Sequence, residues 1–502
     1  MNVILIVNDT LRRDHVSAYT GGKPLNQCWS HEAPDWNVIT PNIDGLAKRG
    51  TIFTNCYCGS TPCMPARRDI YTGRYEFLER GWGPLEEEDP DLPRMVSGPP
   101  NRSLQWAEDN GYSVSHLVSD HFHLWEQGAG NYHMGYSSFD FIRGVEGDNF
   151  QTAPRHFPCP EKYKFEKLER HWRNKTFCQK ISNEWPVEDV FTRAGHWLEK
   201  NHENNNFYLH IDCFNPHEPL DPPEKYVKMF DPDGYGPIAD YTEWPYARWK
   251  NKITPAEFKN LRARYAAKVV QLDTWLGYFF NKIGELGLWE NTIVILTTDH
   301  GTFNGDHGRT GKLQTHEFDA VGHIPFIFAH PGGKGDCREQ LVQLVDLYPT
   351  VLAALGKSIP ENIHGKNLLP VLDDACASTR DYAIMGQFGK SVSITDGRWI
   401  LHQNPVAGNT PLFWYSHYLS KFMGNKLGPC IHNKREVLDE PLWEDQTWLS
   451  DKKTDMNELV NLSEEQPKKL REMQQELKKQ IEALGLCGNA ASEQIDRLGL
   501  KK

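Results

Sequence analysis

The chain has 502 residues and a formal net charge of −12, with 39% hydrophobic and 24% charged residues. These proportions are typical of globular proteins and exclude an intrinsically disordered chain. The acidic balance argues against a general nucleic-acid binder, because phosphate contacts need clustered lysine and arginine. No stretch approaches the roughly 20 consecutive apolar residues of a membrane span. We therefore expect no nucleic-acid partner and no membrane partner.

The N-terminus, MNVILIVNDT, has five apolar residues at positions 3–7 and no basic residue before them. This pattern predicts a buried strand and not a signal peptide. Because Met1 stands directly before the strand, we expect a cytoplasmic protein. The eleven scattered cysteines also favour a reducing compartment. Cys56 and Cys58 have no second pair of ligands at zinc-finger spacing, so we expect no zinc site there.

Three mainly apolar runs, at residues 3–7, 207–211 and 293–296, predict buried strands that end in polar residues; only the second is interrupted, by His210. Helical patterns lie between these runs. The clearest begins with a capping box from Thr254 to Glu257 and has Pro255 at the first helical position. Strands that alternate with helices predict an α/β fold with a large, mostly parallel sheet and helices on both faces.

The chain is expected to form two domains. The first is an α/β domain over residues 1–377, with insertions around 80–190, where Trp, Pro, Gly and His are frequent and periodicity is weak. The second is a smaller α+β domain over residues 378–502. Short strands are predicted at 391–395 and 399–402, and a charged helix at about 464–484.

Polar residues that follow parallel strands meet at one edge of the sheet, where ligands bind in such folds. Asp9, His217, Asp299 and His300 all follow predicted strands. Two carboxylates and an imidazole can hold a divalent cation. Each aspartate taken alone is equally compatible with a cap on the following helix or turn. Asn8 can add a neutral carbonyl oxygen.

Cys63 is followed by Pro65 and Arg67 at fixed offsets. A reactive thiol needs a helix N-terminus or a cation to lower its pKa, and Arg67 can provide the charge. A lone cysteine near a helix start is also compatible with a small buried side chain. Spacing does not decide between the two interpretations.

The segment CMPAR at residues 63–67, with TGR at residues 72–74, resembles the C-x-P-x-R…TGR signature of the sulfatase family, within the alkaline-phosphatase-like superfamily. Other segments similar to family motifs occur in the same order along nearly the whole chain: residues 7–14, 40–47, 215–219, 291–301, 308–312 and 458–462. The resemblance implies a sulfuric ester hydrolase with an alkaline-phosphatase-like fold. It also implies that Cys63 is converted to formylglycine by a formylglycine-generating or anaerobic sulfatase-maturating enzyme.

The resemblance further implies one bound divalent metal ion. Its ligands would be Asp9, Asp299, His300 and the modified Cys63. Asn8 stands where many sulfatases have a second aspartate. An oxygen-rich donor set suggests calcium, whereas the histidine also admits manganese, zinc or iron.

The remaining implied roles concern substrate and catalysis. Arg67 would position the formylglycine, His217 would act as the general acid at the leaving oxygen, and His123 matches a family histidine. Lys312 would bind the anionic oxygens of the substrate. His121 occupies the place of a family lysine and would also bind substrate, although it is only partly charged at neutral pH.

In that family the hydrated aldehyde attacks the sulfur of a small anionic ester, and the second hydroxyl of the hydrate later allows sulfate to leave. The substrate would be a sulfated carbohydrate or an aryl sulfate. Phosphonate monoester hydrolases and related phosphodiesterases share the signature, so that activity is the alternative. A catalytically silent binding protein with an unmodified Cys63 is a third interpretation.

Overall fold

The computed structural model describes residues 1–29, 33–126, 130–153, 166–178, 184–204, 206–233, 247–248, 254–312, 315–417, 434–436 and 446–501. Parts of the predicted insertions, at residues 127–129, 154–165 and 179–183, lie outside the described residues.

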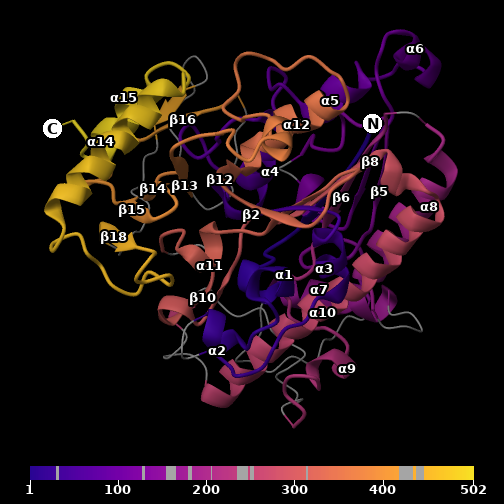
Figure 1. Cartoon of the computed structure of the whole chain (residues 1–502), viewed down its shortest axis with the longest axis horizontal. Coiled ribbons are helices and arrows are strands. Elements are labelled where there is room, and N and C mark those ends of the chain that lie inside the picture. The colour runs from indigo at the N-terminus through magenta and orange to yellow at the C-terminus, as the bar shows by residue number, and fades with distance from the viewer. Residues whose placement is uncertain are drawn as a thin grey trace.

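A mixed sheet of eight strands forms the centre of the described structure, in the order β12-β2-β11-β8-β1-β6-β4-β5 (Figure 1). Neighbouring strands are parallel, except that β11 runs antiparallel to both β2 and β8. The predicted fold class, a large and mostly parallel sheet, is thus confirmed. The strands are β1 (Asn2–Asn8), β2 (Gly50–Tyr57), β4 (Ser115–Ser119), β5 (Ser138–Phe141), β6 (Tyr208–Cys213), β8 (Thr292–Thr297), β11 (Phe326–Ala329) and β12 (Asp336–Gln343).

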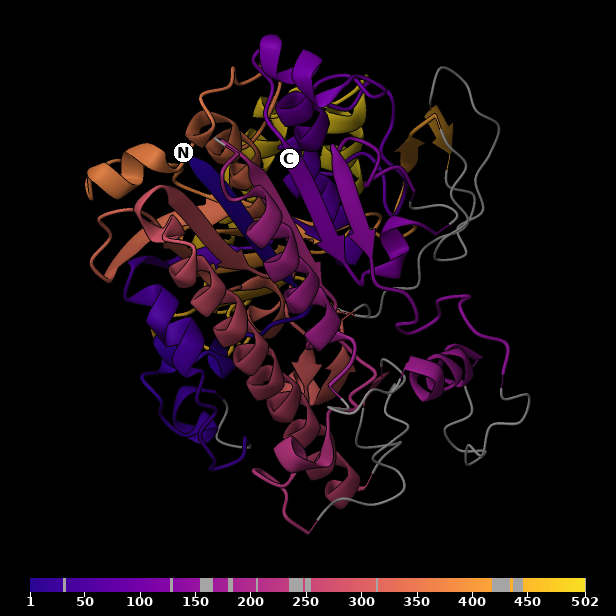
Figure 2. The same cartoon turned by 90° about the vertical axis from the view of Figure 1, so that its right-hand side faces the viewer.

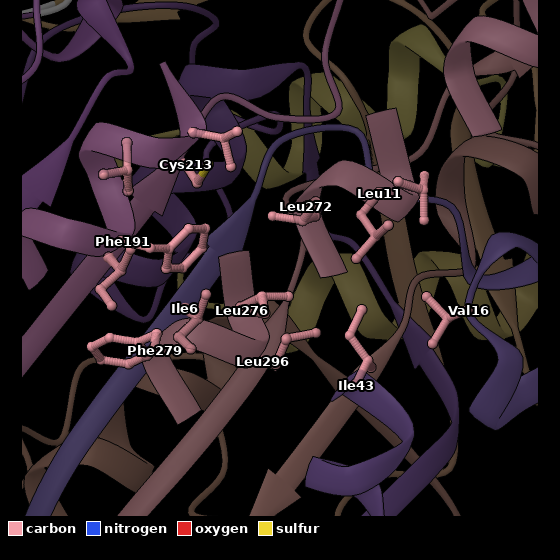
Figure 3. Close-up of a cluster of buried hydrophobic side chains, with 14 of the residues drawn as sticks. Ile6, Leu11, Val16, Ile43, Phe191, Cys213, Leu272, Leu276, Phe279 and Leu296 are labelled. Carbon is pink, nitrogen blue, oxygen red and sulfur yellow. The ribbon is translucent and has the colours of Figure 1, made fainter. Parts of the chain in front are cut away.

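Helices cover both faces of this sheet because its central strands are apolar on both sides. In β1, Ile4 and Ile6 belong to the core on one face, whereas Leu5 belongs to the core on the other. Figure 2 shows the two long helices of the first face, α8 and α10, side by side in front of the sheet. Ile6 lies among side chains of these helices, including Phe191 and Leu276 (Figure 3).

The helices of the first face are α3 (Pro41–Ala47), α8 (Val187–Asn201) and α10 (Pro255–Glu285); those of the second face are α4 (Cys63–Thr72), α5 (Leu92–Ser97) and α12 (Leu347–Ala354). The predicted capping box of α10 is confirmed. The Thr254 side chain accepts a hydrogen bond from the Glu257 backbone, and the Glu257 carboxylate accepts one from the Thr254 backbone.

A second sheet of five described strands has the order β18-β15-β14-β13-β3. Its strands are β3 (Ser60–Thr61), β13 (Ala383–Gln387), β14 (Val392–Thr395), β15 (Trp399–Gln403) and β18 (Trp448–Asp451). Helices α14 (Pro467–Ala483) and α15 (Ala490–Arg497) share its apolar core, and Figure 1 shows them in yellow at one end of the molecule. Strand β3 comes from the first part of the chain and pairs in parallel with β13. The C-terminal sheet is therefore completed by the residues just before Cys63.

The region expected to be insertions contributes β4 and β5 to the main sheet, which differs from the prediction. β4 contains only two apolar residues, Leu117 and Val118, between polar ones. Several of its polar groups bond to residues at the start of β5 or just before it: Ser137 Oγ accepts from the Ser115 backbone at 3.1 Å, and His116 Nδ1 lies 2.7 Å from Ser138 Oγ. Hydrogen bonding therefore allows a strand here without a continuous apolar run.

The other described elements are short, except for one helix of 13 residues. Antiparallel pairs join β7 (Ala247–Arg248), β10 (Arg309–Gly311) and β9 (Phe303–Asn304), and join β16 (Phe413–Tyr415) with β17 (Lys434–Glu436). The remaining α-helices are α1 (Ser17–Thr20), α2 (Leu25–Cys28), α6 (Leu104–Asp109), α7 (Glu166–Cys178), α9 (Glu224–Val227), α11 (Asp319–Gly322) and α13 (Leu369–Asp373). Among the described helices, none has the length and apolar character needed to cross a bilayer.

Candidate active site

The candidate active site lies at the carboxyl edge of the main sheet, where β1, β4, β6 and β8 run parallel and end together. Asp9 follows β1, Asp299 and His300 follow β8, His121 follows β4, and His217 lies on the loop after β6. The structure brings all five together. Residues that are hundreds of positions apart in sequence are thus neighbours because of the strand order.

Four possible metal-binding groups form a compact, buried cluster. One donor atom from each of Asp9, Cys63, Asp299 and His300 lies within 4.8 Å of the others. Cys63 Sγ is 3.9 Å from Asp9 Oδ1. These are the predicted metal ligands apart from Asn8.

Hydrogen bonds leave lone pairs available in this cluster. His300 donates from Nδ1 to the Gly301 carbonyl at 2.8 Å, so the neutral ring has its unprotonated Nε2 on the side of Asp299 Oδ2, 3.3 Å away. A second hydrogen bond of this kind orients metal-binding histidines. Asn8 is fully buried, and neither of its side-chain polar atoms has a hydrogen-bond partner among the described residues. A buried amide without a partner is rare, and a bound ion would satisfy its carbonyl oxygen.

The backbone near Thr10 also holds the cluster. Asp299 Oδ1 accepts hydrogen bonds from the backbone of Thr10 at 3.0 Å and of His300 at 2.8 Å. Thr10 has a φ of 60°, a conformation that β-branched residues rarely adopt. This strained residue therefore fixes one carboxylate oxygen and leaves Oδ2 directed at the cluster.

Arg67 connects the carboxylates of the site. Its guanidinium makes a bidentate pair with Asp212 at 2.8 and 2.7 Å, and it lies 2.7 Å from Asp299 Oδ2 and 3.1 Å from Asp9 Oδ2. Nη1 also donates to the Cys63 carbonyl at 3.1 Å. Arg67 was predicted to position the residue at 63, and its hydrogen bond to the Cys63 carbonyl places it close enough to do so. Sequence reasoning did not assign Asp212 to the site, although it is an acidic residue at the end of a buried strand.

The local structure explains why Cys63 is held rigidly. It is the first residue of α4, separated from β3 by Pro62 alone, and its side chain is buried. Asp69 of α4 accepts hydrogen bonds from the backbone and hydroxyl of Ser60 in β3, both at 2.6 Å. The helix ends at Gly73, whose φ of 66° favours glycine and whose added Cβ would lie 3.1 Å from Tyr348. The TGR motif thus terminates the helix that carries Cys63.

The unmodified thiol is a poor nucleophile in this environment. Burial raises the pKa of Cys63 well above its usual range, and the nearby Asp9 carboxylate raises it further. The opposing effects of Lys312 and Arg67 are smaller. A thiol at this position therefore stays protonated at neutral pH.

Lys312 is buried at the same site, with a side chain that is 3% exposed. Its Nζ lies 3.8 Å from Asp9 Oδ1 and 4.0 Å from Glu218 Oε1, and it has no hydrogen-bond partner among the described residues. Burial opposes its charge, but Cys63, Glu218 and Asp9 together raise its pKa above the usual range. A buried ammonium whose donors are unsatisfied indicates a place for an anion.

His217 faces the same carboxylate from the loop after β6, with Nε2 at 3.9 Å from Asp9 Oδ1. Its Nδ1 donates to the Glu218 carbonyl at 2.5 Å, so the neutral ring has its unprotonated Nε2 on this side. Burial lowers the pKa of His217 to about 4. The ring must therefore gain a proton at Nε2 before it can donate one there. Glu218, which sequence reasoning did not assign to the site, has a carboxylate oxygen 3.5 Å from Nδ1.

The other two predicted histidines lie in different environments. His121 Nε2 is 2.9 Å from Asp9 Oδ2, and burial lowers its pKa well below the usual range, so a neutral His121 orients Asp9. His123 lies between two carboxylates, with Nδ1 at 2.5 Å from Glu126 and Nε2 at 3.3 Å from Glu146. Burial opposes its charge, but these carboxylates raise its pKa. These two carboxylates therefore favour the protonated form of His123.

The charges of the site fit a divalent cation. Burial raises the pKa of Asp9, and the carboxylate of Asp299 adds to this effect. Burial also opposes the ionisation of Asp299, but His300, Arg67 and Lys312 lower its pKa well below the usual range. A divalent ion would favour the ionised form of Asp9. Asp9, Asp299, His300 and the residue at position 63 would hold the ion, and Asn8 offers a further oxygen.

Comparisons with known proteins agree with this geometry. The profile of the sulfatase family matches residues 1–357. Arylsulfatase K of the dog, Canis lupus familiaris, is 26% identical over 400 residues, which cover 74% of this chain and 66% of that protein.

Several solved structures share the fold. One, in complex with its substrate D-glucosamine-2-N,6-O-disulfate, has a TM-score of 0.64 and 16% identity, covering 96% of this chain and 97% of the other. The phosphonate monoester hydrolase of Agrobacterium radiobacter has a TM-score of 0.63 and 20% identity, covering 95% and 94%. Because the family profile matches most of its length, the chain belongs to the sulfatase family.

Proposed function

We propose that the chain hydrolyses a sulfate ester with a formylglycine made from Cys63 and one bound divalent metal ion. The observation that carries the proposal is the buried Lys312 ammonium, which lacks a hydrogen-bond partner among the described residues and faces the cluster of Asp9 and Cys63. When present, the metal ion would polarise the ester oxygens, and the hydrated formylglycine would supply the nucleophilic hydroxyl.

The protein's own residues divide the remaining work. Lys312 binds the sulfate oxygens, where its charge stabilises the negative charge that develops during the reaction. Arg67 holds Asp9, Asp299 and the Cys63 carbonyl in one arrangement. His217 takes up a proton at Nε2 when the anionic ester binds and gives it to the leaving oxygen. His123 is fixed between the Glu126 and Glu146 carboxylates, beside His121.

Calcium is the metal ion that we propose first. Carboxylate and amide oxygens from Asp9, Asp299 and Asn8 outnumber the single nitrogen of His300, and calcium prefers oxygen ligands. Manganese, zinc and iron are the alternatives that the histidine admits. Metal analysis of the purified protein distinguishes them.

The substrate class that we propose is a sulfated carbohydrate, with aryl sulfates as simpler substitutes. The support is indirect: one structure of the same fold was solved with a sulfated glucosamine as its substrate. We further propose that the protein works in the cytoplasm. A formylglycine-generating or anaerobic sulfatase-maturating enzyme would be its partner during maturation.

Two experiments test the proposal. Peptide mass spectrometry across Cys63, on protein from its native host or made with a maturating enzyme, should find formylglycine. Metal-replete protein should then turn over an aryl sulfate faster than an aryl phosphonate, and Cys63→Ala should abolish both activities. A preference for the phosphonate would assign the phosphonate monoester hydrolase activity instead. An unmodified thiol in both preparations would favour the silent binding protein.

A further inference from the structure

The geometry points to Lys268 as the residue that positions His217 for proton transfer, an inference that rests on the proposed hydrolysis. Lys268 lies on α10, in a different part of the chain from the sheet edge that carries the other site residues. It is buried, with 7% of its surface exposed. Lysine is rarely buried unless its charge has partners.

The partners of Lys268 are backbone groups of the loop that carries His217. Its Nζ donates to the His217 carbonyl at 2.6 Å and to the Pro219 carbonyl at 3.1 Å. Its own carbonyl accepts a hydrogen bond from Asn215 Nδ2 at 3.0 Å. One residue of α10 therefore binds the beginning, the middle and the end of the segment 215–219.

Different contacts orient the ring of His217 and position the loop that carries it. The ring of His217 is oriented within the loop, because its Nδ1 donates to the Glu218 carbonyl. The position of the loop on the body of the protein depends on Lys268 and on two further hydrogen bonds. The Phe214 backbone donates to Asp120 Oδ1 at 2.7 Å, and Arg264 Nη1 of α10 donates to the Leu220 carbonyl at 2.9 Å. Without the Lys268 ammonium, both carbonyls would lose a charged donor in a buried place. The loop, and the ring with it, would then shift relative to Asp9.

A shift of the ring matters because proton transfer requires close contact. As the bond between sulfur and the ester oxygen breaks, its electron pair stays on the leaving oxygen, which takes the proton from His217 Nε2. A misplacement of about 1 Å can reduce such a step by about a hundredfold. The effect is largest for a leaving group that needs the proton, such as phenol, whose pKa is about 10 like that of tyrosine. It is small for 4-nitrophenol, which leaves readily as an anion.

The test compares Lys268→Met, His217→Ala and the double variant on phenyl sulfate and 4-nitrophenyl sulfate, using metal-loaded protein that carries formylglycine. We expect Lys268→Met to lower kcat for phenyl sulfate by about tenfold or more, and to lower it much less for 4-nitrophenyl sulfate. In the His217→Ala background, Lys268→Met should change kcat by less than about twofold. Lys268→Arg should recover most of the activity because it keeps a charged donor. Lys259→Met, at an exposed lysine of the same helix, is the matched control and should behave as wild type.

Three results would overturn the inference. The first is a Lys268→Met variant with the wild-type dependence on the leaving group. The second is an equal loss from Lys268→Met with and without His217, which indicates a general structural effect. If Lys268→Met does not fold, Lys268→Gln carries the same double-variant comparison. The third result is a wild-type protein that is inert on sulfates and phosphonates, which would overturn the proposed function as well. An active wild type with either of the first two results overturns the positioning role alone. If aryl phosphonates are the better substrates, the same test uses phenyl and 4-nitrophenyl phosphonates.

Discussion

Replacing Lys312 with methionine removes one buried positive charge and keeps most of the apolar side chain. Its Nζ lies 3.8 Å from Asp9 Oδ1 and 4.0 Å from Glu218 Oε1. At such a separation, two unit charges interact by about 4 kcal/mol at an effective dielectric constant near 20. Loss of one preorganised donor to a developing negative charge typically lowers kcat by about 10²–10³-fold. We therefore expect Lys312→Met to lower kcat/KM for an aryl sulfate by about 10²–10³-fold.

The assay must separate loss of substrate binding from loss of the metal ion. Removing a cation beside Asp9 does not weaken the attraction of the site for a divalent ion, so the metal content per chain should stay at the wild-type level. Kinetics and metal analysis are therefore made on the same preparation, after mass spectrometry has shown formylglycine at position 63. Lys334→Met, at an exposed position, is the control and should keep full activity.

One outcome would refute this reasoning directly: an unchanged kcat/KM in a variant with full metal and formylglycine content. Lys312 would then make no contact with the reacting anion. A variant that has lost its metal would show that the lysine supports the metal site, contrary to the electrostatic argument. Each outcome points to a different role for the buried ammonium.

The other predictions concern metal binding, stability and pH. Asp299→Asn should lose most of its bound metal on dialysis; metal analysis showing wild-type content would remove Asp299 from the ligand set. Asp212→Asn leaves the buried Arg67 with one weaker partner and should reduce the free energy of unfolding by about 3 kcal/mol, measured by denaturant titration; an unchanged midpoint would contradict this. Burial raises the pKa of Glu458 to about 8, so this side chain keeps a proton in the folded state that the unfolded chain, with a pKa of about 4.3, releases. The contribution of this group to the free energy of unfolding is therefore lost as pH rises between those values. Glu458→Gln, which can still donate to His402, should show a smaller loss of this free energy with pH. Equal slopes of the free energy of unfolding against pH for both proteins would rule the linkage out.

The features visible in the sequence were those with strong local signals. The apolar runs that became β1 and β8 are continuous, the run that became β6 is interrupted only by His210, and the ends of β1 and β8 placed Asp9 and Asp299 at one edge of the sheet. The start of α10 was marked by its capping box and proline. These signals depend only on neighbouring residues, so the local sequence is sufficient to predict them.

What was missed depends on partners that are distant in sequence. Asp212 looks like any polar residue at a strand end until Arg67 is placed beside it, 145 positions earlier in the chain. Lys268 interrupts the apolar face of a long helix, and only the position of the loop at 215–219 explains its charge. Strand β3 has two residues and no pattern of its own. Such features follow from tertiary contacts and not from local periodicity.

The pairing of β3 with β13 has a consequence for the order of events during synthesis. Thr61 and Gly386, which are joined across this pair, lie 325 positions apart. At about 5–20 residues per second, the ribosome needs roughly 15–65 s to make the chain between them. During that interval the strand beside Cys63 has no edge to join, whereas in the finished protein the sulfur is buried. If Cys63 is modified, the modifying enzyme would therefore compete with translation of the C-terminal region, and slow elongation would lengthen the time that the cysteine remains within its reach.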